Sequence, residues 1–318
     1  MMNFIDLFSG IGGFRIALEN AGGKCVFSSE IDKYARETYR MNFNEIPHGD
    51  ITEILSKDIP DHNVLAAGFP CQPFSLAGKR LGFEDARGTL FFEILKILKS
   101  KRPESFILEN VAGIVNHDSG KTIKVIEDSL KNINYRFEWK LLNAKDYGVP
   151  QNRNRWYCIG VDNEKKHLEN LNIEKIFPKP KDLKYTIDDI IKYNDDEAYQ
   201  ISEIAKRNIK KFKNLYLEKN SITSNSLIAN NIRPSKVSFS SKGISPCLTA
   251  KMGTGGNNVP VIEKWNRKLT EKECLMLMGF PNEFKIKENY SQSYKQIGNS
   301  VVVPIIKDIA SNLINSLK

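Results

Sequence analysis

Residues 4–14 read Phe4-Ile-Asp-Leu-Phe-Ser-Gly-Ile-Gly-Gly-Phe14. The apolar start predicts a buried strand, and the glycines predict a turn that opens a helix. Such a turn lets the backbone approach a ligand closely, and a helix N-terminus offers free N–H groups. An ordinary strand-to-helix turn explains the glycines equally well. A dinucleotide fingerprint needs a third glycine where this sequence has Arg15, so an NAD enzyme is disfavoured.

Short apolar runs alternate with amphipathic stretches through the first 160 residues. This rhythm predicts an α/β fold with a doubly wound, mostly parallel sheet. Ligands of such sheets bind beyond the carboxyl ends of the strands, so the loops there are candidate sites. The expected strands are 3–8, 25–29, 64–67, 105–108 and 156–160, and the expected helices are 13–21, 33–41, 90–99 and 122–133.

The rhythm fails beyond about residue 162. Residues 177–180, Phe-Pro-Lys-Pro, are typical of a linker, and residues 220–245 are rich in Ser and Asn. Helical patterns return at 269–278 and 301–317, so we expect the end of the chain to pack against the first domain. The division that we predict is a first domain at 1–161, a smaller irregular domain with its linkers at 162–268, and a returning segment at 269–318.

Basic residues outnumber acidic ones, 47 to 38, which gives a net charge of +9. Residues 203–242 hold nine basic and two acidic residues, so most of the excess lies there. An excess of this kind favours a polyanionic partner. A solvated helix face over residues 206–213 is an equally good interpretation of the same charges.

Membrane and metal sites are both disfavoured by the composition. No run approaches the roughly 20 apolar residues of a membrane-spanning helix, and Asp6, Arg15 and Glu19 interrupt any signal-peptide pattern. We therefore expect a cytoplasmic protein with no membrane partner. The five cysteines include no C-x-x-C pair, so neither a metal site nor a disulfide framework is expected.

Two acidic residues follow the next strand-like segments. Glu30 closes residues 26–30, twenty positions after Gly10, and Asp50 closes residues 48–50. A carboxylate at the second strand's end can accept both ribose hydroxyl protons, and Asp50 could then take an adenine amine. An adenosyl ligand without a pyrophosphate fits this arrangement, and S-adenosylmethionine is the common example. Either acid could instead cap a helix.

Cys71 lies in Gly68-Phe-Pro-Cys-Gln-Pro-Phe-Ser75, directly after an expected strand. A lone cysteine is most often a small core residue. The flanking prolines fix the loop's shape, and a strand-end loop is where a thiolate can face a ligand. The loop continues through glycines to residue 88, so it could close over a substrate.

Three further polar residues stand beside expected strands. Glu109 follows an apolar run, where burial raises the pKa of a carboxyl and suits it to act as an acid; helix capping is the alternative. Arg153 and Arg155 precede the strand at 156–160, and alternation predicts that both point to one face. There they could hold a phosphate or a carbonyl, or form surface ion pairs.

Taken in order, these segments resemble the cytosine-5 DNA methyltransferase family, and most closely its bacterial restriction-modification members of the HhaI type. Residues 4–14 look like the family's cofactor motif, 68–75 its Pro-Cys-Gln motif and 109–111 its Glu-Asn-Val motif. Residues 151–155 resemble its Gln-x-Arg-x-Arg motif, and 298–301 its Gly-Asn-Ser motif. The resemblance implies methyl transfer from S-adenosylmethionine to C5 of a flipped-out cytosine in duplex DNA.

The resemblance also assigns roles. Cys71 would attack C6 of cytosine, Glu109 would act at N3, and Arg153 and Arg155 would hold the base carbonyl. The cofactor would be bound by Phe8, Gly10, Gly12, Glu30, Ile31, Asp50, Pro70, Leu90, Asn299 and Ser300. DNA contacts are expected from Arg87, Lys236, Thr249, Gly253 and Gly255, the glycines letting backbone enter a groove.

The same family implies a bacterial, cytoplasmic monomer without a metal, with a cognate restriction endonuclease that acts on the same DNA site. Two alternatives stay open. An RNA-directed cytosine methyltransferase is the nearer one, although its usual Cys-Phe-Thr signature is absent. A catalytically silent DNA-binding relative is the other, and the presence of Cys71, Glu109 and both arginines counts against it.

Overall fold

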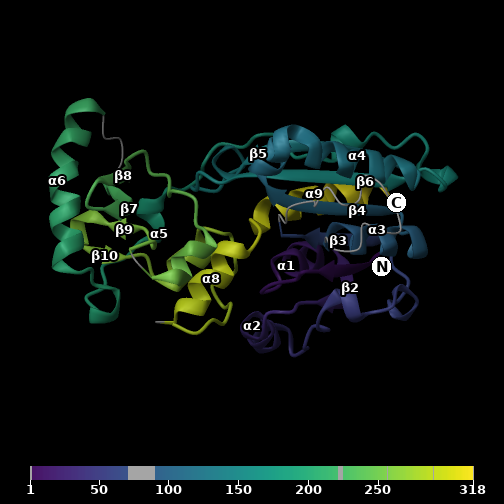
Figure 1. The fold of residues 1–318 in the computed structure, drawn as a ribbon, viewed down its shortest axis with the longest axis horizontal. Helices are drawn as coiled ribbons and strands as arrows, with labels where there is room; N and C mark the ends of the chain where they lie inside the picture. The colour runs from purple at the N-terminus through teal and green to yellow at the C-terminus, as the bar shows by residue number, and fades with distance from the viewer. Residues whose placement is uncertain (1, 71–89, 221–224, 256, 289, 318) are drawn as a thin grey trace.

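Two lobes make up the protein (Figure 1). The computed structural model describes residues 2–70, 90–220, 225–255, 257–288 and 290–317. Within them, the larger lobe is built on a six-stranded sheet in the order β2-β1-β3-β4-β6-β5. Its strands are β1 (Met2–Leu7), β2 (Gly23–Ser29), β3 (Val64–Gly68), β4 (Ser105–Val111), β5 (Tyr135–Asn143) and β6 (Asn154–Asp162).

The first four strands are parallel, and β6 runs antiparallel to both β4 and β5. The α/β class with a doubly wound, mostly parallel sheet is thus confirmed. β1 lies inside the sheet because its side chains are apolar on both faces: Phe4 belongs to one hydrophobic core, and Ile5 and Leu7 belong to the other. Such two-sided burial is typical of parallel sheets covered by helices.

Helices cover both faces of this sheet (Figure 1). α1 and α9 contribute to the core that includes Phe4, and α3 and α4 to the core that includes Ile5. The Asp32 side chain accepts hydrogen bonds from the first turn of α2 and so fixes where that helix begins. The helices are α1 (Gly13–Asn20), α2 (Lys33–Phe43), α3 (Leu90–Lys101), α4 (Lys121–Asn132) and α9 (Val303–Ser316).

The smaller lobe contains a four-stranded sheet in the order β10-β9-β7-β8 within residues 228–268. Its antiparallel strands are β7 (Ile228–Arg233), β8 (Lys236–Ser240), β9 (Val261–Ile262) and β10 (Arg267–Lys268). α6 (Glu203–Lys219) packs on this sheet through Ala205 and Ile209. Figure 1 places α6 at the outer end of the lobe, away from the six-stranded sheet. The short helix α5 (Ile187–Ile190) precedes it in the chain.

The last fifty residues return to the larger lobe, as expected. α7 (Glu271–Met276) and α8 (Ser291–Asn299) lie between the lobes, and α9 packs against α1. Residues 291–316 are long and apolar enough to cross a membrane, but most of their apolar part is buried inside the fold. Ser300 to Val302 also separate them into α8 and α9, so this segment is part of the protein's core.

The sequence prediction missed β5 and α8, as well as α5 and the strands β7 to β10 of the smaller lobe. β5 is an edge strand that carries charged residues such as Arg136, Glu138 and Lys140, which hide the alternation of a strand. α8 is rich in polar residues because one side contacts the smaller lobe and the other lines a cavity. Its apolar stripe is therefore too narrow to stand out in the sequence.

Candidate active site

A cavity of about 630 Å³ opens where the carboxyl ends of β1 to β4 meet α8. The residues that line it come from both ends of the chain. Eight of the ten expected cofactor residues are among them: Phe8, Gly10, Glu30, Ile31, Asp50, Pro70, Leu90 and Asn299. Glu109, Arg153 and Arg155 also line it.

Glu30 links the end of β2 to the glycine turn after β1. One carboxylate oxygen accepts a hydrogen bond of 2.8 Å from the Gly10 N–H, and the other accepts one of 2.7 Å from the Asp32 N–H. Burial raises the pKa of Glu30, and these backbone donors oppose that rise. Because a carboxylate has about four lone-pair sites, each oxygen can accept one more hydrogen bond from a diol.

Asp50 caps a helical turn and also lies at the cavity. Its Oδ1 atom accepts hydrogen bonds from the Thr52 N–H at 2.9 Å and the Thr52 hydroxyl at 2.8 Å, so it caps the short helical turn Ile51–Glu53. The residue also lines the cavity. Capping through Oδ1 is compatible with a ligand amine that approaches Oδ2.

Apolar side chains form the remaining walls of this half of the cavity. Ile31 is 69% exposed, which is unusual for a large aliphatic side chain and leaves its face available to a flat ring. Phe8 adopts a positive φ of 56° at the turn after β1. Ile51, Pro70 and Leu90 line the same space.

Two expected cofactor residues do not line the cavity. Gly12 has a φ of 89° at the start of α1, and a Cβ there would lie 2.3 Å from the Phe43 ring. Its role is therefore to allow the turn and the packing. Ser300 is buried, and its carbonyl accepts a hydrogen bond of 2.6 Å from Arg153.

Lys295 and Gln296 of α8 line the cavity and were not singled out in the sequence. The Lys295 ammonium lies 2.9 Å from the Asp32 carboxylate, and Gln296 accepts a buried hydrogen bond of 2.8 Å from the Thr38 hydroxyl. Both contacts join α8 to α2. Their position directly before the quoted motif at 298–301 is the signal that could have identified them.

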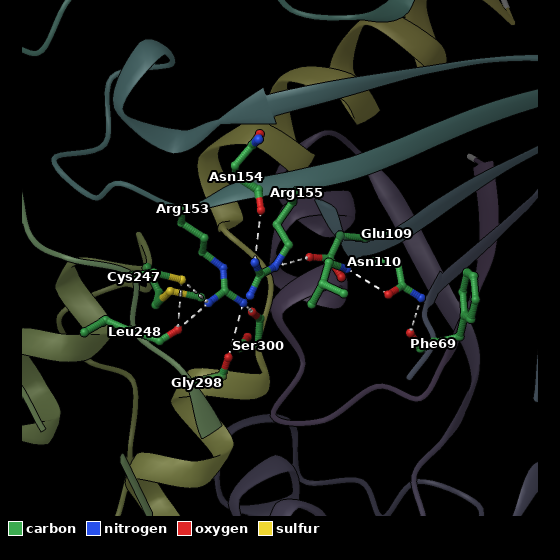
Figure 2. A network of polar contacts seen from close by, with 12 residues as sticks. Phe69, Glu109, Asn110, Arg153, Asn154, Arg155, Cys247, Leu248, Gly298 and Ser300 are labelled. Atoms are coloured by element: carbon green, nitrogen blue, oxygen red, sulfur yellow. Dashed lines mark hydrogen bonds and ion pairs between the residues drawn. The ribbon is translucent and has the colours of Figure 1, made fainter. Parts of the chain in front are cut away.

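Glu109 stands at the other end of the cavity, where β4 ends. Its Oε1 lies 3.2 Å from Arg155 Nε, within ion-pair distance, yet that oxygen is buried and has no hydrogen-bond partner among the described residues (Figure 2). Burial raises the pKa of Glu109, and Arg155 and Arg153 oppose the rise. Such a carboxyl can hold a proton and donate it to a ligand.

Arg153 lines the same cavity as Arg155, and backbone carbonyls hold its guanidinium. Its guanidinium donates to the carbonyls of Leu248 at 2.5 Å, Gly298 at 3.2 Å and Ser300 at 2.6 Å (Figure 2). The expected contact of both arginines with a base stays a prediction: both line the cavity, and the buried Nε of Arg153 has no hydrogen-bond partner among the described residues.

Asn110 fixes the chain just before Cys71. Its side-chain amide donates a hydrogen bond of 2.8 Å to the Phe69 carbonyl, and its side-chain oxygen accepts one of 2.8 Å from the Val111 N–H (Figure 2). The end of β3 is thereby tied to the end of β4. Cys71 and Arg87 themselves lie outside the described residues.

The expected DNA-contacting residues lie in different surroundings. Thr249 begins the helical turn Ala250–Thr254, and the exposed Lys236 begins β8. Gly255 is exposed, with a φ of 72°. Gly253 packs closely on α8: a Cβ there would lie 2.5 Å from the Ser291 carbonyl oxygen, so this packing requires a glycine. Its contact with DNA stays a prediction.

The basic segment at 203–242 is mostly helix α6. Lys206 pairs with Glu203, and Lys213 pairs with Glu263, both at 2.8 Å. Since α6 lies at the outer end of the smaller lobe, most of these charges are far from the cavity. The solvated-face interpretation therefore describes residues 206–213 better than a contact with the site.

The lining suits S-adenosylmethionine. A cavity of this size is within the usual range of ligand sites, roughly 300–1,000 Å³. Glu30 offers acceptors for a ribose, Asp50 an acceptor for an amine, and Ile31 an apolar face. Within the described ranges, no group of three or more His, Cys, Asp or Glu residues is placed to hold a metal ion.

The model of the C-5 cytosine-specific DNA methylase family matches residues 2–315. The chain belongs to this family. It is 42% identical to the Type II methyltransferase M.HhaI of Haemophilus parahaemolyticus, over 99% of this chain and 95% of that protein. It is 44% identical to M.HaeII of Haemophilus aegyptius, over 98% and 93% of the two chains.

Solved structures share the fold. A Spodoptera frugiperda DNMT2 variant superposes with a TM-score of 0.71 at 25% identity, covering 100% of this chain and 99% of the other. The protein is therefore a DNA cytosine-5 methyltransferase, and its fold and family use S-adenosylmethionine.

Proposed function

We propose that the protein is the modification enzyme of a Type II restriction-modification system, methylating one cytosine of a specific duplex DNA site. Full-length identities of 42% and 44% to Type II methyltransferases support the proposal. The observation that carries the chemistry is the position of Glu109 and Arg155 in one cavity with Glu30 and Pro70, the residue that precedes Cys71.

The proposed reaction begins at Cys71. Its thiolate adds to C6 of an extruded cytosine, which makes C5 nucleophilic. S-adenosylmethionine, when bound, would supply an electrophilic methyl group. C5 then takes this methyl group as the S–CH₃ bond breaks and S-adenosylhomocysteine leaves. Loss of the C5 proton then re-forms the C5–C6 double bond and expels the Cys71 thiolate.

Glu109 stabilises the addition by sharing its proton with N3 of the base, because negative charge develops there when the thiolate attacks. A carboxyl whose pKa is raised by burial carries the required proton. Arg155 keeps Glu109 oriented and offers N–H donors to the base carbonyl. Arg153 lines the same cavity, where it holds the surrounding backbone and supports Arg155 at the base carbonyl.

In the cofactor half, Glu30 binds the ribose hydroxyls and Asp50 the adenine amine, while Phe8, Ile31 and Leu90 enclose the ring. Asn299 approaches from the end of α8. Asn110 holds the Phe69 carbonyl, two residues before Cys71.

The partners that we propose are duplex DNA and, acting separately on the same site, a cognate restriction endonuclease in a bacterial cytoplasm. Thr249, Lys236 and Gly255 contact the DNA from the smaller lobe, and Arg87 from the segment after Cys71. The proposal also includes that the protein acts as a monomer.

The test is bisulfite sequencing of an unmethylated plasmid after incubation with the protein and S-adenosylmethionine. We expect protected cytosines at one position of one recurring sequence. Transfer RNA with labelled methyl donor is run in parallel; label found only in the RNA would assign the protein to the RNA-directed alternative. Absence of label from both would favour the catalytically silent relative.

A further inference from the structure

The segment Cys247–Thr254 of the smaller lobe and helix α8 meet backbone against backbone. A Cβ on Gly298 would lie 2.1 Å from the Thr249 carbonyl carbon and 2.4 Å from the Ala250 nitrogen. A Cβ on Gly253 would lie 2.5 Å from the Ser291 carbonyl oxygen and 2.7 Å from Lys295 Cβ. One glycine from each side thus removes the side chain that would hold the two segments apart.

Arg153 bridges the same two segments by hydrogen bonds. The residue is 2% exposed. It donates hydrogen bonds to the Leu248 carbonyl in the smaller lobe and to the carbonyls of Gly298 and Ser300 in and just after α8. Gln151 adds a second bridge: its side chain accepts from the Leu248 N–H at 3.0 Å and donates to the Leu277 carbonyl at 2.8 Å.

Helix α8 also forms part of the cofactor cavity, and Gly298 itself is among the residues that line it. Lys295, Gln296 and Asn299 line it, and the contacts of Lys295 with Asp32 and of Gln296 with Thr38 hold α8 against α2. A nine-residue helix is a stiff body, so a displacement at one side of α8 moves the other side with it.

We propose that this joint, formed by Gly253, Gly298 and Arg153, couples DNA recognition to cofactor binding. Arg153 is then a positioning residue. The inference rests on the proposed DNA-methylating function. DNA that seats on Thr249–Thr254 presses the turn onto α8 and holds Lys295 and Asn299 in the arrangement that binds the cofactor. Linkage requires the reverse effect of equal size.

The coupling is measured as a ratio of two dissociation constants. S-adenosylhomocysteine is titrated calorimetrically into the full-length protein, with and without a duplex carrying the mapped site. We expect the wild-type protein to bind the ligand about 5- to 150-fold more tightly with the duplex, the usual range of coupling between two sites.

Gly253→Ala is the test variant, because its new methyl group pushes the turn away from α8 without adding an atom to the cavity lining. We expect the ratio to fall towards one while ligand affinity without DNA changes little. Lys251→Ala is the matched control: it lies exposed on the same turn, so it weakens DNA binding with and without ligand equally and leaves the ratio at the wild-type value.

A wild-type ratio of one, or a Gly253→Ala ratio equal to that of Lys251→Ala, would overturn the proposal. If a thermal melt shows that Gly253→Ala does not fold, Arg153→Lys takes its place, since a single ammonium keeps the charge but cannot span three carbonyls in the same geometry. Failure of the proposed function is distinguishable, because the wild-type protein would then show no site-specific binding of the duplex at all.

Discussion

The two lobes place their functional residues in opposite ways. In the larger lobe, Gly10, Glu30, Gly68 and Glu109 all stand at or just beyond the carboxyl ends of strands that are buried on both faces. In the smaller lobe, the turn Ala250–Thr254 lies outside the four-stranded sheet and is held by α8 and Arg153.

This contrast explains how one fold serves a fixed chemistry and a variable target. Strand ends in a packed sheet cannot move without disturbing a core, so the reacting groups keep their geometry. A turn supported from outside its own sheet can change sequence at little cost to folding. Substitutions in the larger lobe should therefore abolish chemistry on every DNA, and those in the smaller lobe should alter binding only.

The sharpest test of the larger lobe is Cys71→Ser. We expect methyl transfer to fall by a factor on the order of 10⁴ or more, because the covalent step loses its nucleophile. Affinity for S-adenosylhomocysteine should stay at the wild-type value, since Glu30 and Asp50 are untouched. Radiolabelled methyl transfer and calorimetric titration provide the two measurements, and substantial remaining turnover would refute the role.

Glu109→Gln should lower kcat by roughly 10²- to 10⁴-fold, the usual contribution of an acid or base in the transition state. The raised pKa of Glu109 also predicts the pH dependence of wild-type activity. Activity should fall as pH rises through that pKa, because the carboxyl loses its proton. The variant should lack this alkaline limb. A pH–rate profile that is identical in both proteins would remove Glu109 from the proton transfer.

Asp6 tests the packing that supports the larger lobe. It lies fully buried in β1, neither carboxylate oxygen has a hydrogen-bond partner among the described residues, and burial raises its pKa to about 8. The pKa of Asp6 in the folded protein lies above its unfolded value of 3.8. The contribution of Asp6 to the free energy of unfolding is therefore greatest below about pH 4 and is lost as pH rises towards 8.

Asp6→Asn should remove this dependence of the free energy of unfolding on pH. For one proton the slope is at most about 1.4 kcal/mol per pH unit. Urea unfolding at pH 5 and pH 8 checks it. Asp32→Asn serves as the control, since Lys295 and backbone donors lower the pKa of Asp32 and the wild-type slope between these pH values should persist.

Lys236→Ala probes the smaller lobe and has the smallest expected effect. The residue is exposed at the start of β8. Losing one phosphate contact should weaken DNA binding modestly, equally for all sequences, and lower the salt-dependence slope by about one. Binding isotherms at several salt concentrations measure this, with kcat at saturating DNA unchanged. A changed target sequence would show instead that Lys236 reads bases.

The sequence predicted the larger lobe well because its strands are continuous apolar runs and its polar residues stand at their ends. Glu30, Asp50 and Glu109 could be placed in one cavity on that ground alone. The role of Arg153 could not, because it depends on carbonyls of Leu248 and Ser300 that are distant in the sequence.

The packing between the two lobes could not be predicted from the sequence either. The sequence gives no sign that Gly253 packs against α8, because the two segments are about 40 residues apart in the chain. The burial of Asp6 without a partner is also invisible in a sequence, since an acidic residue in a β-strand more often faces solvent.

The most direct measurement uses duplex DNA with 5-fluorocytosine at the mapped target position, incubated with the protein and S-adenosylmethionine. Fluorine at C5 cannot leave as a cation, so the bond from sulfur to C6 should persist. We predict a denaturation-resistant protein–DNA complex whose cross-linked peptide contains Cys71. Methylation of ordinary DNA without any such complex, or a cross-link at another residue, would contradict the account.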